Sequence, residues 1–141
     1  MPAQPLRLGV ISFAHAHINA YIESIRDFDD ATVVAAWDDD RERGQAQCAK
    51  YDLAFEPDLD ALLRRDDLDA VFVTSPTNQH AAHTLAAAQA GKHVLLQKPM
   101  ALTLADCDAI IAAIGRYGIQ FSMCYQMRAD PVNQRIKALL A

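Results

Sequence analysis

Residues 91–102 read Gly-Lys-His-Val-Leu-Leu-Gln-Lys-Pro-Met-Ala-Leu. The apolar run at the centre predicts a buried strand, which ends in a polar Gln97-Lys98-Pro99 turn. A lysine at the carboxyl end of a strand faces the crevice of an open α/β sheet, where nucleotides usually bind. The proline adds a constraint, because X-Pro bonds are the only peptide bonds in which the cis form costs little. We therefore expect Lys98 to be held in a tight turn at a ligand site.

The rest of the chain alternates strand-like and helix-like segments around this one. Apolar strands are predicted at 6–12, 32–37, 69–74, 92–96 and 119–125, with a short extended piece at 54–55. Helices are predicted at 18–25, 41–51, 58–63, 79–90 and 103–117, the last opened by a Thr103–Asp106 capping box. Such alternation indicates a parallel sheet with right-handed crossovers and helices on both faces. The predicted class is α/β, a Rossmann-type doubly wound parallel sheet in one domain.

This domain is expected to occupy residues 1–125. Asp130-Pro131 then opens another helix, whose apolar stripe has no partner in the predicted domain. We therefore interpret residues 126–141 as the start of a connection, and the chain as the first domain of a longer protein.

Composition narrows the class of protein. The chain has 141 residues, 52% of them hydrophobic, and a net charge of -5, with thirteen basic residues that are scattered. This balance suits a compact domain and argues against a nucleic-acid partner. Cys48, Cys107 and Cys124 show no C-x-x-C spacing, so we predict neither disulfides nor a thiolate zinc site. No apolar run approaches the roughly 18 residues of a membrane span, and we expect a cytoplasmic protein.

The first βα turn, residues 9–17, lies where dinucleotide-binding folds carry G-x-G-x-x-G. Ser12, Ala14 and His17 stand at the three glycine positions. Serine and alanine are small enough for a close backbone approach, whereas His17 cannot serve as the packing glycine. The helix that follows should still present free N–H groups, which can hold a pyrophosphate without glycine. The cofactor-binding residues predicted in this turn are Ser12, Phe13, Ala14 and His15.

Asp38 follows the third glycine position by 21 residues, close to the roughly 20 expected for a carboxylate that binds a ribose diol. An acid there also repels a 2′-phosphate and so favours NAD over NADP, although Arg41 and Arg43 could soften the preference. The alternative is that Asp38, Asp39 and Asp40 only form a solvated turn at a helix start. We predict Asp38 as the ribose ligand and treat Asp39 and Asp40 as surface residues.

Residues 74–80, Thr-Ser-Pro-Thr-Asn-Gln-His, form a polar loop after the strand at 69–74. They offer hydroxyls, amides and an imidazole to the crevice. The alternative is a helix capped by Thr77 or Asn78, with His80 on the surface. The predicted cofactor contacts in this loop are Thr74, Ser75, Pro76, Asn78 and His80.

The histidines also raise the question of a metal. His15 and His17 are two positions apart, and His80 and His83 share a helix face. Zinc needs three or four converging ligands, and these pairs can meet only if the two strand ends adjoin. We predict no metal site and expect imidazoles that bind substrate or are satisfied within the protein.

The ordered set of motifs resembles the glucose-fructose oxidoreductase / inositol dehydrogenase / MocA family over essentially the whole chain. The motifs are Asp38, the 74–80 loop, Ala90-Gly91-Lys92-His93-Val94, Gln97-Lys98-Pro99 and residues 125–131. The resemblance implies that family's N-terminal NAD(P)-binding domain. It also implies a following C-terminal α/β domain, absent here, that binds substrate and builds a homo-oligomer.

The resemblance implies hydride transfer between NAD(P) and a sugar, a polyol or a related secondary alcohol. The family's E-K-P signature maps to Gln97, Lys98 and Pro99, which implies contacts with the cofactor and a catalytic role for Lys98. An ammonium group there could polarise a carbonyl or relay an alcohol proton, a role usually worth about 10²- to 10⁴-fold in rate. Gln97 departs from the signature glutamate. The family's other catalytic groups lie in the second domain, so the isolated chain should bind cofactor without turnover.

Two other classes of protein are alternatives to this interpretation. A phosphorelay receiver is excluded by residue order, because its acids follow the first strand, which here ends in Ser12-Phe13-Ala14. A non-catalytic NAD(P)-binding sensor or regulatory module stays open, since Gln97 and the altered first turn would suit one.

Overall fold

The computed structural model describes residues 4–140 and contains one parallel sheet of six strands, ordered β3-β2-β1-β4-β5-β6. The strands are β1 (Leu6–Ile11), β2 (Ala31–Trp37), β3 (Ala54–Phe55), β4 (Ala70–Val73), β5 (His93–Gln97) and β6 (Phe121–Cys124). The chain winds outward twice from the centre, so the strand order reverses between β1 and β4. The predicted doubly wound fold is confirmed, and this reversal is where ligands bind such sheets.

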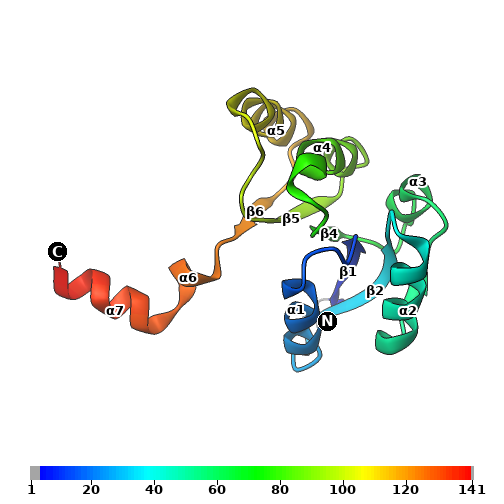
Figure 1. Ribbon diagram of the computed structural model, residues 1–141, viewed down its shortest axis with the longest axis horizontal. Coiled ribbons are helices and arrows are strands. Elements are labelled where there is room, and N and C mark those ends of the chain that lie inside the picture. Colours follow the sequence, from blue (N-terminus) through cyan, green and yellow to red (C-terminus); the bar gives the residue numbers. More distant parts are fainter. Residues whose placement is uncertain (1–3, 141) are drawn as a thin grey trace.

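Helices cover the two faces unequally. The helices are α1 (His17–Ile25), α2 (Arg41–Tyr51), α3 (Leu59–Leu63), α4 (His80–Gln89), α5 (Leu104–Tyr117), α6 (Gln126–Ala129) and α7 (Pro131–Leu140), with a 3₁₀ turn, η1 (Thr77–Gln79), before α4. α4 and α5 lie together on one side of the sheet, and α1 lies on the other (Figure 1). α6, at residues that follow the last strand, was not predicted.

Alternating strand residues fill two cores, one on each face. Val10 and Phe72 pack with α1 and α2, whereas Ile11, Val71 and Val73 pack with α3, α4 and α5. All five side chains are buried. Burying a side chain of this kind stabilises the fold by about 1.5–3 kcal/mol. The near-continuous apolar runs in the sequence are therefore explained by helices on both sides of the central strands.

The helix ends form as their residues predict. Thr103 Oγ1 accepts the N–H of Asp106 at 3.1 Å, which confirms Thr103 as the N-cap of α5, and the Thr103 hydroxyl donates to the Asp106 carboxylate at 2.7 Å. Asp58 accepts the N–H of Ala61 at 2.6 Å and begins α3. Gly118 ends α5 at a φ of +65°, a conformation that costs glycine little. The side-chain caps formed by Thr103 and Asp58 each contribute about 1 kcal/mol to the free energy of unfolding.

The end of the described chain leaves the body of the fold. α7 projects away from the sheet (Figure 1). Its predicted apolar stripe is exposed at Val132, Ile136, Leu139 and Leu140. No helix within residues 4–140 has the length and apolarity needed to cross a bilayer.

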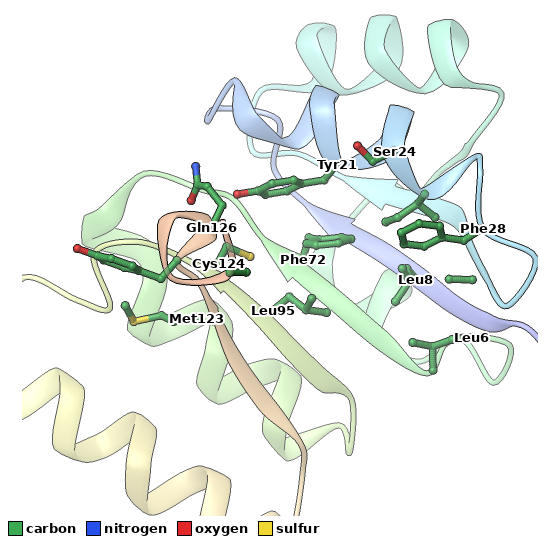
Figure 2. A pocket seen from close by; sticks show the side chains of 14 residues that line it. Leu6, Leu8, Tyr21, Ser24, Phe28, Phe72, Leu95, Met123, Cys124 and Gln126 are labelled. Atoms are coloured by element: carbon green, nitrogen blue, oxygen red, sulfur yellow. The ribbon is translucent and has the colours of Figure 1, made fainter. Parts of the chain in front are cut away.

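One sheet face also stays open. A largely apolar groove of about 430 Å³ lies over β1, β4, β5 and β6, beside α1. Figure 2 shows Tyr21 above Phe72 and Leu95 in this groove, with Gln126 at the same end and Leu6 and Phe28 at the other. The groove therefore lies along the sheet face, and its Tyr21 end meets the polar edge where the strands end.

Candidate functional site

The turn after β1 keeps the shape of a glycine turn without glycine. Ser12 has a φ of +70°, in the left-handed region that the motif's first glycine normally occupies. Its N–H donates to the carbonyl of Trp37 at 2.7 Å, and the hydroxyl of Thr74 donates to the carbonyl of Ser12. The turn is thus tied to the ends of β2 and β4. Ser12 and Thr74 are both fully buried, so they shape the site from beneath.

The amides of the following loop are mostly engaged within the chain. The N–H of His15 donates to the carbonyl of Thr74 at 3.0 Å. The first three N–H groups of α1, on His17, Ile18 and Asn19, donate to atoms of His15 and Ala16 at 3.2–3.3 Å. The expectation of free amides at this helix start is therefore corrected. These amides are engaged because the short turn at residues 15–16 places acceptor atoms of His15 and Ala16 next to the first turn of the helix. A pyrophosphate would have to replace these long hydrogen bonds.

Asp38 stands at the end of β2, but its carboxylate faces inward. The side chain is completely buried. One oxygen accepts the N–H of Phe13 at 2.7 Å, and the other accepts the N–H of Asp40 at 2.9 Å. Arg43 donates to both oxygens, at 2.6 and 3.0 Å, and hydrogen bonding to Asp38 raises the pKa of Arg43. Asp38 therefore holds the β1 turn and the start of α2 in place, and a ribose diol would reach it only if Arg43 moved.

Asp39 and Asp40 are more exposed, as expected of surface residues. Asp40 caps α2 by accepting the N–H of Arg43 at 3.0 Å. Asp39 accepts hydrogen bonds from Arg43 at 3.0 Å and from Gln79 at 3.5 Å. Partial burial opposes ionisation of Asp39, but hydrogen bonding and the charge of Arg43 outweigh it and lower its pKa. The end of β2 is thus linked to the loop after β4 across the end of β1.

The loop after β4 turns two histidines inward. Ser75 is buried, and its Oγ lies 2.9 Å from Nδ1 of His83. Burial lowers the pKa of His83. His80 is only 1% exposed, so the alternative prediction that put this residue on the surface is wrong. Neither Thr77 nor Asn78 caps α4, because η1 comes between and makes Gln79 the residue before the helix.

The turn after β5 places Lys98 at the same edge. The Lys98–Pro99 bond is cis. Gln97 is fully buried, and its Oε1 accepts the N–H of Lys98 at 2.8 Å. The Lys98 side chain is partly exposed and forms no ion pair among residues 4–140. It therefore offers an ammonium group at the strand ends without a carboxylate partner in that part of the chain.

Gln97 also organises the first loop from the opposite side. Its Nε2 lies 3.2 Å from Nδ1 of His17, 3.5 Å from Nδ1 of His15 and 3.4 Å from the hydroxyl of Tyr21. Burial, followed by the charges of His17, Lys98 and His80, lowers the pKa of His15. An amide can donate to these groups, whereas a carboxylate would accept only. Gln97 thus links the ends of β1 and β5 through donors that glutamate would lack.

The predicted site residues divide into three groups. The buried or half-buried edge brings together Ser12, His15, Asp38, Thr74, Ser75, His80, Gln97 and Lys98. Ala14, Pro76, Asn78 and Pro99 are exposed around it. Phe13 turns its ring into the core, so only its backbone belongs to the site. Within residues 4–140 no group of three or more His, Cys, Asp or Glu residues is placed to hold a metal ion.

The sequence did not predict the contacts of Tyr21 and His17 with Gln97, or the contact of Gln79 with Asp39. Tyr21 lies in the apolar stripe of α1, and its ring stacks on Phe72 with centroids 5.6 Å apart. A signal was present, because Tyr21 follows His17 by four positions and shares its helix face. Gln79 carries no comparable signal, since its link to Asp39 depends on the turn η1.

Comparisons with known proteins agree with this architecture. A family model described as an oxidoreductase family with an NAD-binding Rossmann fold, GFO_IDH_MocA, matches residues 7–125. The chain is 34% identical to D-apiose dehydrogenase of Paraburkholderia graminis over 130 residues, which cover 92% of this chain and 34% of that protein. It is 42% identical to inositol 2-dehydrogenase 1 of Saccharopolyspora erythraea over 115 residues, 78% of this chain and 34% of that protein.

Solved structures show the same fold. KijD10, a 3-ketoreductase from Actinomadura kijaniata in complex with NADP and TDP-benzene, has a TM-score of 0.89 at 26% identity, over 97% of this chain and 42% of that one. An NAD-binding protein from Listeria innocua has a TM-score of 0.79 at 25% identity, over 89% of this chain and 36% of that one. The chain therefore spans about a third of the length of the curated relatives it matches.

Proposed function

Since the chain belongs to the oxidoreductase family with an NAD-binding Rossmann fold, we propose that it binds the nicotinamide cofactor of a sugar, polyol or related secondary-alcohol oxidoreductase. One observation carries the proposal. The ends of β1 and β4 lie side by side at the reversal of the strand order, and the neighbouring β5 ends in the turn that carries Lys98. The 3-ketoreductase and the two sugar or polyol dehydrogenases named above support this substrate class.

The residues at the sheet edge fit a dinucleotide. The left-handed Ser12 keeps the turn short, and Ala14 leaves it unobstructed. Thr74 and Ser75 support the turn from beneath through their own hydrogen bonds, and His15 lies half-buried beside it. We place the pyrophosphate against the 12–15 turn. When bound, the nicotinamide would supply or accept the hydride.

We propose that the adenosine ribose lies over the Asp38–Arg43 pair. The negative charge at Asp38 and Asp39 disfavours a 2′-phosphate, which supports NAD over NADP. Arg43 opposes this preference for NAD, because it pairs with both carboxylates and its side chain is about one-third exposed. If Arg43 turned outward, Asp38 would gain room for a diol and Arg43 could meet a phosphate. The balance of these two residues is thus the proposed origin of cofactor preference.

Lys98 is the proposed catalytic residue. Its backbone N–H is fixed by the buried Gln97, so the side chain starts from an ordered turn. From there the ammonium group could polarise a substrate carbonyl or pass a proton to or from an alcohol oxygen. We also propose that residues 126–141 form the connection to a substrate-binding and oligomer-forming domain. The exposed apolar stripe of α7 agrees with that role.

Titration with NADH and NADPH, followed by fluorescence, tests the cofactor assignment. We expect saturable NADH binding that is tighter than NADPH binding, and Asp38→Ala should weaken NADH binding more than NADPH binding. Because Asp38 is buried, circular dichroism must show that the variant is folded. An equal loss for both nucleotides would remove the ribose assignment.

Turnover is tested in the full-length protein with a panel of sugars and polyols. Lys98→Ala should lower kcat by about 10²- to 10⁴-fold while NADH still binds. Lys50→Ala is the matched control, because it removes one exposed lysine from the last turn of α2. Tight nucleotide binding without oxidation of any substrate would instead favour a non-catalytic module and contradict the catalytic proposal.

A further inference from the structure

His80 lies between two strand ends and has no ring nitrogen left for a ligand. It is the first residue of α4 and is 1% exposed. Nδ1 lies 2.8 Å from the carbonyl oxygen of Pro99, and Nε2 lies 3.0 Å from the carbonyl oxygen of Ser75. Ser75 follows β4 and Pro99 follows β5. A single buried ring therefore joins the carboxyl ends of two neighbouring strands.

Both partners of this ring can only accept. A backbone carbonyl has no proton, so each contact is a hydrogen bond only when the ring nitrogen donates. A neutral imidazole has one N–H and would turn a lone pair toward the other carbonyl. The ring nitrogen and the carbonyl oxygen would then be two buried acceptors without a donor between them, which is unfavourable. At least one ring nitrogen must therefore donate, and Nδ1 makes the shorter contact, 2.8 Å to the carbonyl oxygen of Pro99.

The charges around His80 come from four parts of the fold. His83 lies one turn away on α4, His15 lies in the loop after β1, and Lys98 lies in the turn after β5. Burial, with a further contribution from the charge of His80, lowers the pKa of both His15 and His83. Asp39, at the end of β2, acts on His83 in the opposite direction. The two neighbouring imidazoles are thus biased toward their neutral forms.

We propose that His80 is a positioning residue for Lys98, because its buried ring bridges the carbonyls of Ser75 and Pro99 and clamps the turn that carries Lys98. Lys98 is then bracketed, because Gln97 holds its N–H and His80 holds the carbonyl of the next residue. This arrangement sets the direction in which the lysine leaves the turn. The inference rests on the proposed function for the catalytic role of Lys98, whereas the contacts of His80 do not depend on that function.

The protonation of the ring is measured by ¹⁵N NMR of the histidine side chains at pH 7. His80→Gln identifies the signals of residue 80 by their loss. A ring nitrogen that carries a proton gives a ¹⁵N shift far from that of a nitrogen without one. Nδ1 is expected to carry a proton and to donate to the Pro99 carbonyl, and an Nδ1 without a proton would overturn the proposal. This measurement needs no cofactor and no substrate, and the wild-type spectrum decides even if a variant fails to fold.

The clamp itself is measured by amide exchange and amide shifts in the turn. The N–H of Met100 shares a peptide group with the Pro99 carbonyl, so its ¹⁵N shift reports the hydrogen bond to His80. His80→Gln should shift this signal and speed exchange of the Lys98 N–H by about tenfold or more. His83→Gln is the matched control, because His83 is also buried on α4 but contacts the Ser75 hydroxyl. It should leave both signals unchanged.

Activity in the full-length protein separates positioning from folding. His80→Gln should lower kcat by about tenfold with little change in the KM for the nucleotide, since Lys98 acts on the substrate. If the turn signals change but the wild-type protein binds no nicotinamide, the clamp stands and the proposed function fails. If the protein binds NADH and His80→Gln leaves the Lys98 and Met100 signals unchanged, the clamp is overturned.

Discussion

Ser12 combines a strained backbone with a useful hydroxyl. Its φ of +70° costs an L-residue roughly 1–2 kcal/mol relative to glycine. The hydroxyl offsets part of this cost, since its oxygen accepts the N–H of Ala14 at 3.2 Å and lies 3.3 Å from Asp39. A serine at this position therefore keeps the turn and adds a polar link to the end of β2.

Two substitutions separate these effects. Ser12→Gly and Ser12→Ala both remove the hydroxyl, but only glycine relieves the positive φ. After allowing for the greater flexibility of glycine in the unfolded chain, we expect Ser12→Ala to be less stable than Ser12→Gly by about 1 kcal/mol. Urea denaturation at pH 7 measures the difference. Equal midpoints would contradict this expectation, because the strain would then be no larger than the flexibility cost of glycine.

At the scale of elements, α2 packs unusually close to the site. A Cβ on Gly44 would lie 2.6 Å from a ring carbon of Phe55 and 2.7 Å from Cβ of Asp38. No other residue type fits this contact without movement. The close approach brings Arg43, on the first turn of α2, to the carboxylate of Asp38.

A pair of glycine substitutions tests this packing. Gly44→Ala should lower the free energy of unfolding by about 1–3 kcal/mol, because the helix must move away from β2 and β3. Gly115→Ala on α5 is the control, since a Cβ there meets nothing within 4 Å and should raise stability by up to about 1 kcal/mol. Denaturant midpoints give both values. A Gly44→Ala protein as stable as the wild type would contradict the packing argument.

At the scale of the whole molecule, the edge opposite the site is held by ion pairs. Asp67, before β4, accepts hydrogen bonds from Arg7 of β1 and from Arg65 at 2.8 Å each. Arg65 also pairs with Glu56 at 2.6 Å. Hydrogen bonds from Arg65 and then Arg7 lower the pKa of Asp67 to about 2. These contacts join the start of β1 to the segment that leads into β4.

This network predicts a loss of stability in acid. Because the pKa of Asp67 is lower in the folded protein than its ordinary 3.8, its contribution is complete above that value and disappears as the pH falls through about 2. The difference in urea midpoint between the wild type and Asp67→Asn should therefore be constant from pH 7 to 5 and shrink toward pH 2. Asp66→Asn, which removes the neighbouring charge but neither arginine contact, is the control. A difference that stays constant to pH 2 would contradict the assignment.

Local sequence patterns were sufficient for the six strands and for the helices other than α6 and the turn η1. The helix at 41–51 and the strand piece at 54–55 are found at the predicted residues, and most other ends differ by one or two positions. The reason is that apolar periodicity, the Thr103 capping box and the glycine at 118 act within a few residues of the chain. The doubly wound class also followed from the alternation of strands and helices, whereas the strand order was not predicted.

Tertiary structure alone decided how the site residues are used. Asp38 was recognisable as an acid after a strand, but its burial beneath Arg43 depends on the close approach of α2 at Gly44. His80 was recognisable as a polar loop residue, but its bridge between Ser75 and Pro99 joins segments 24 positions apart. Sequence determines which groups reach the edge of the sheet, because period and capping are local. Which of them face a ligand and which face the protein depends on packing between distant segments.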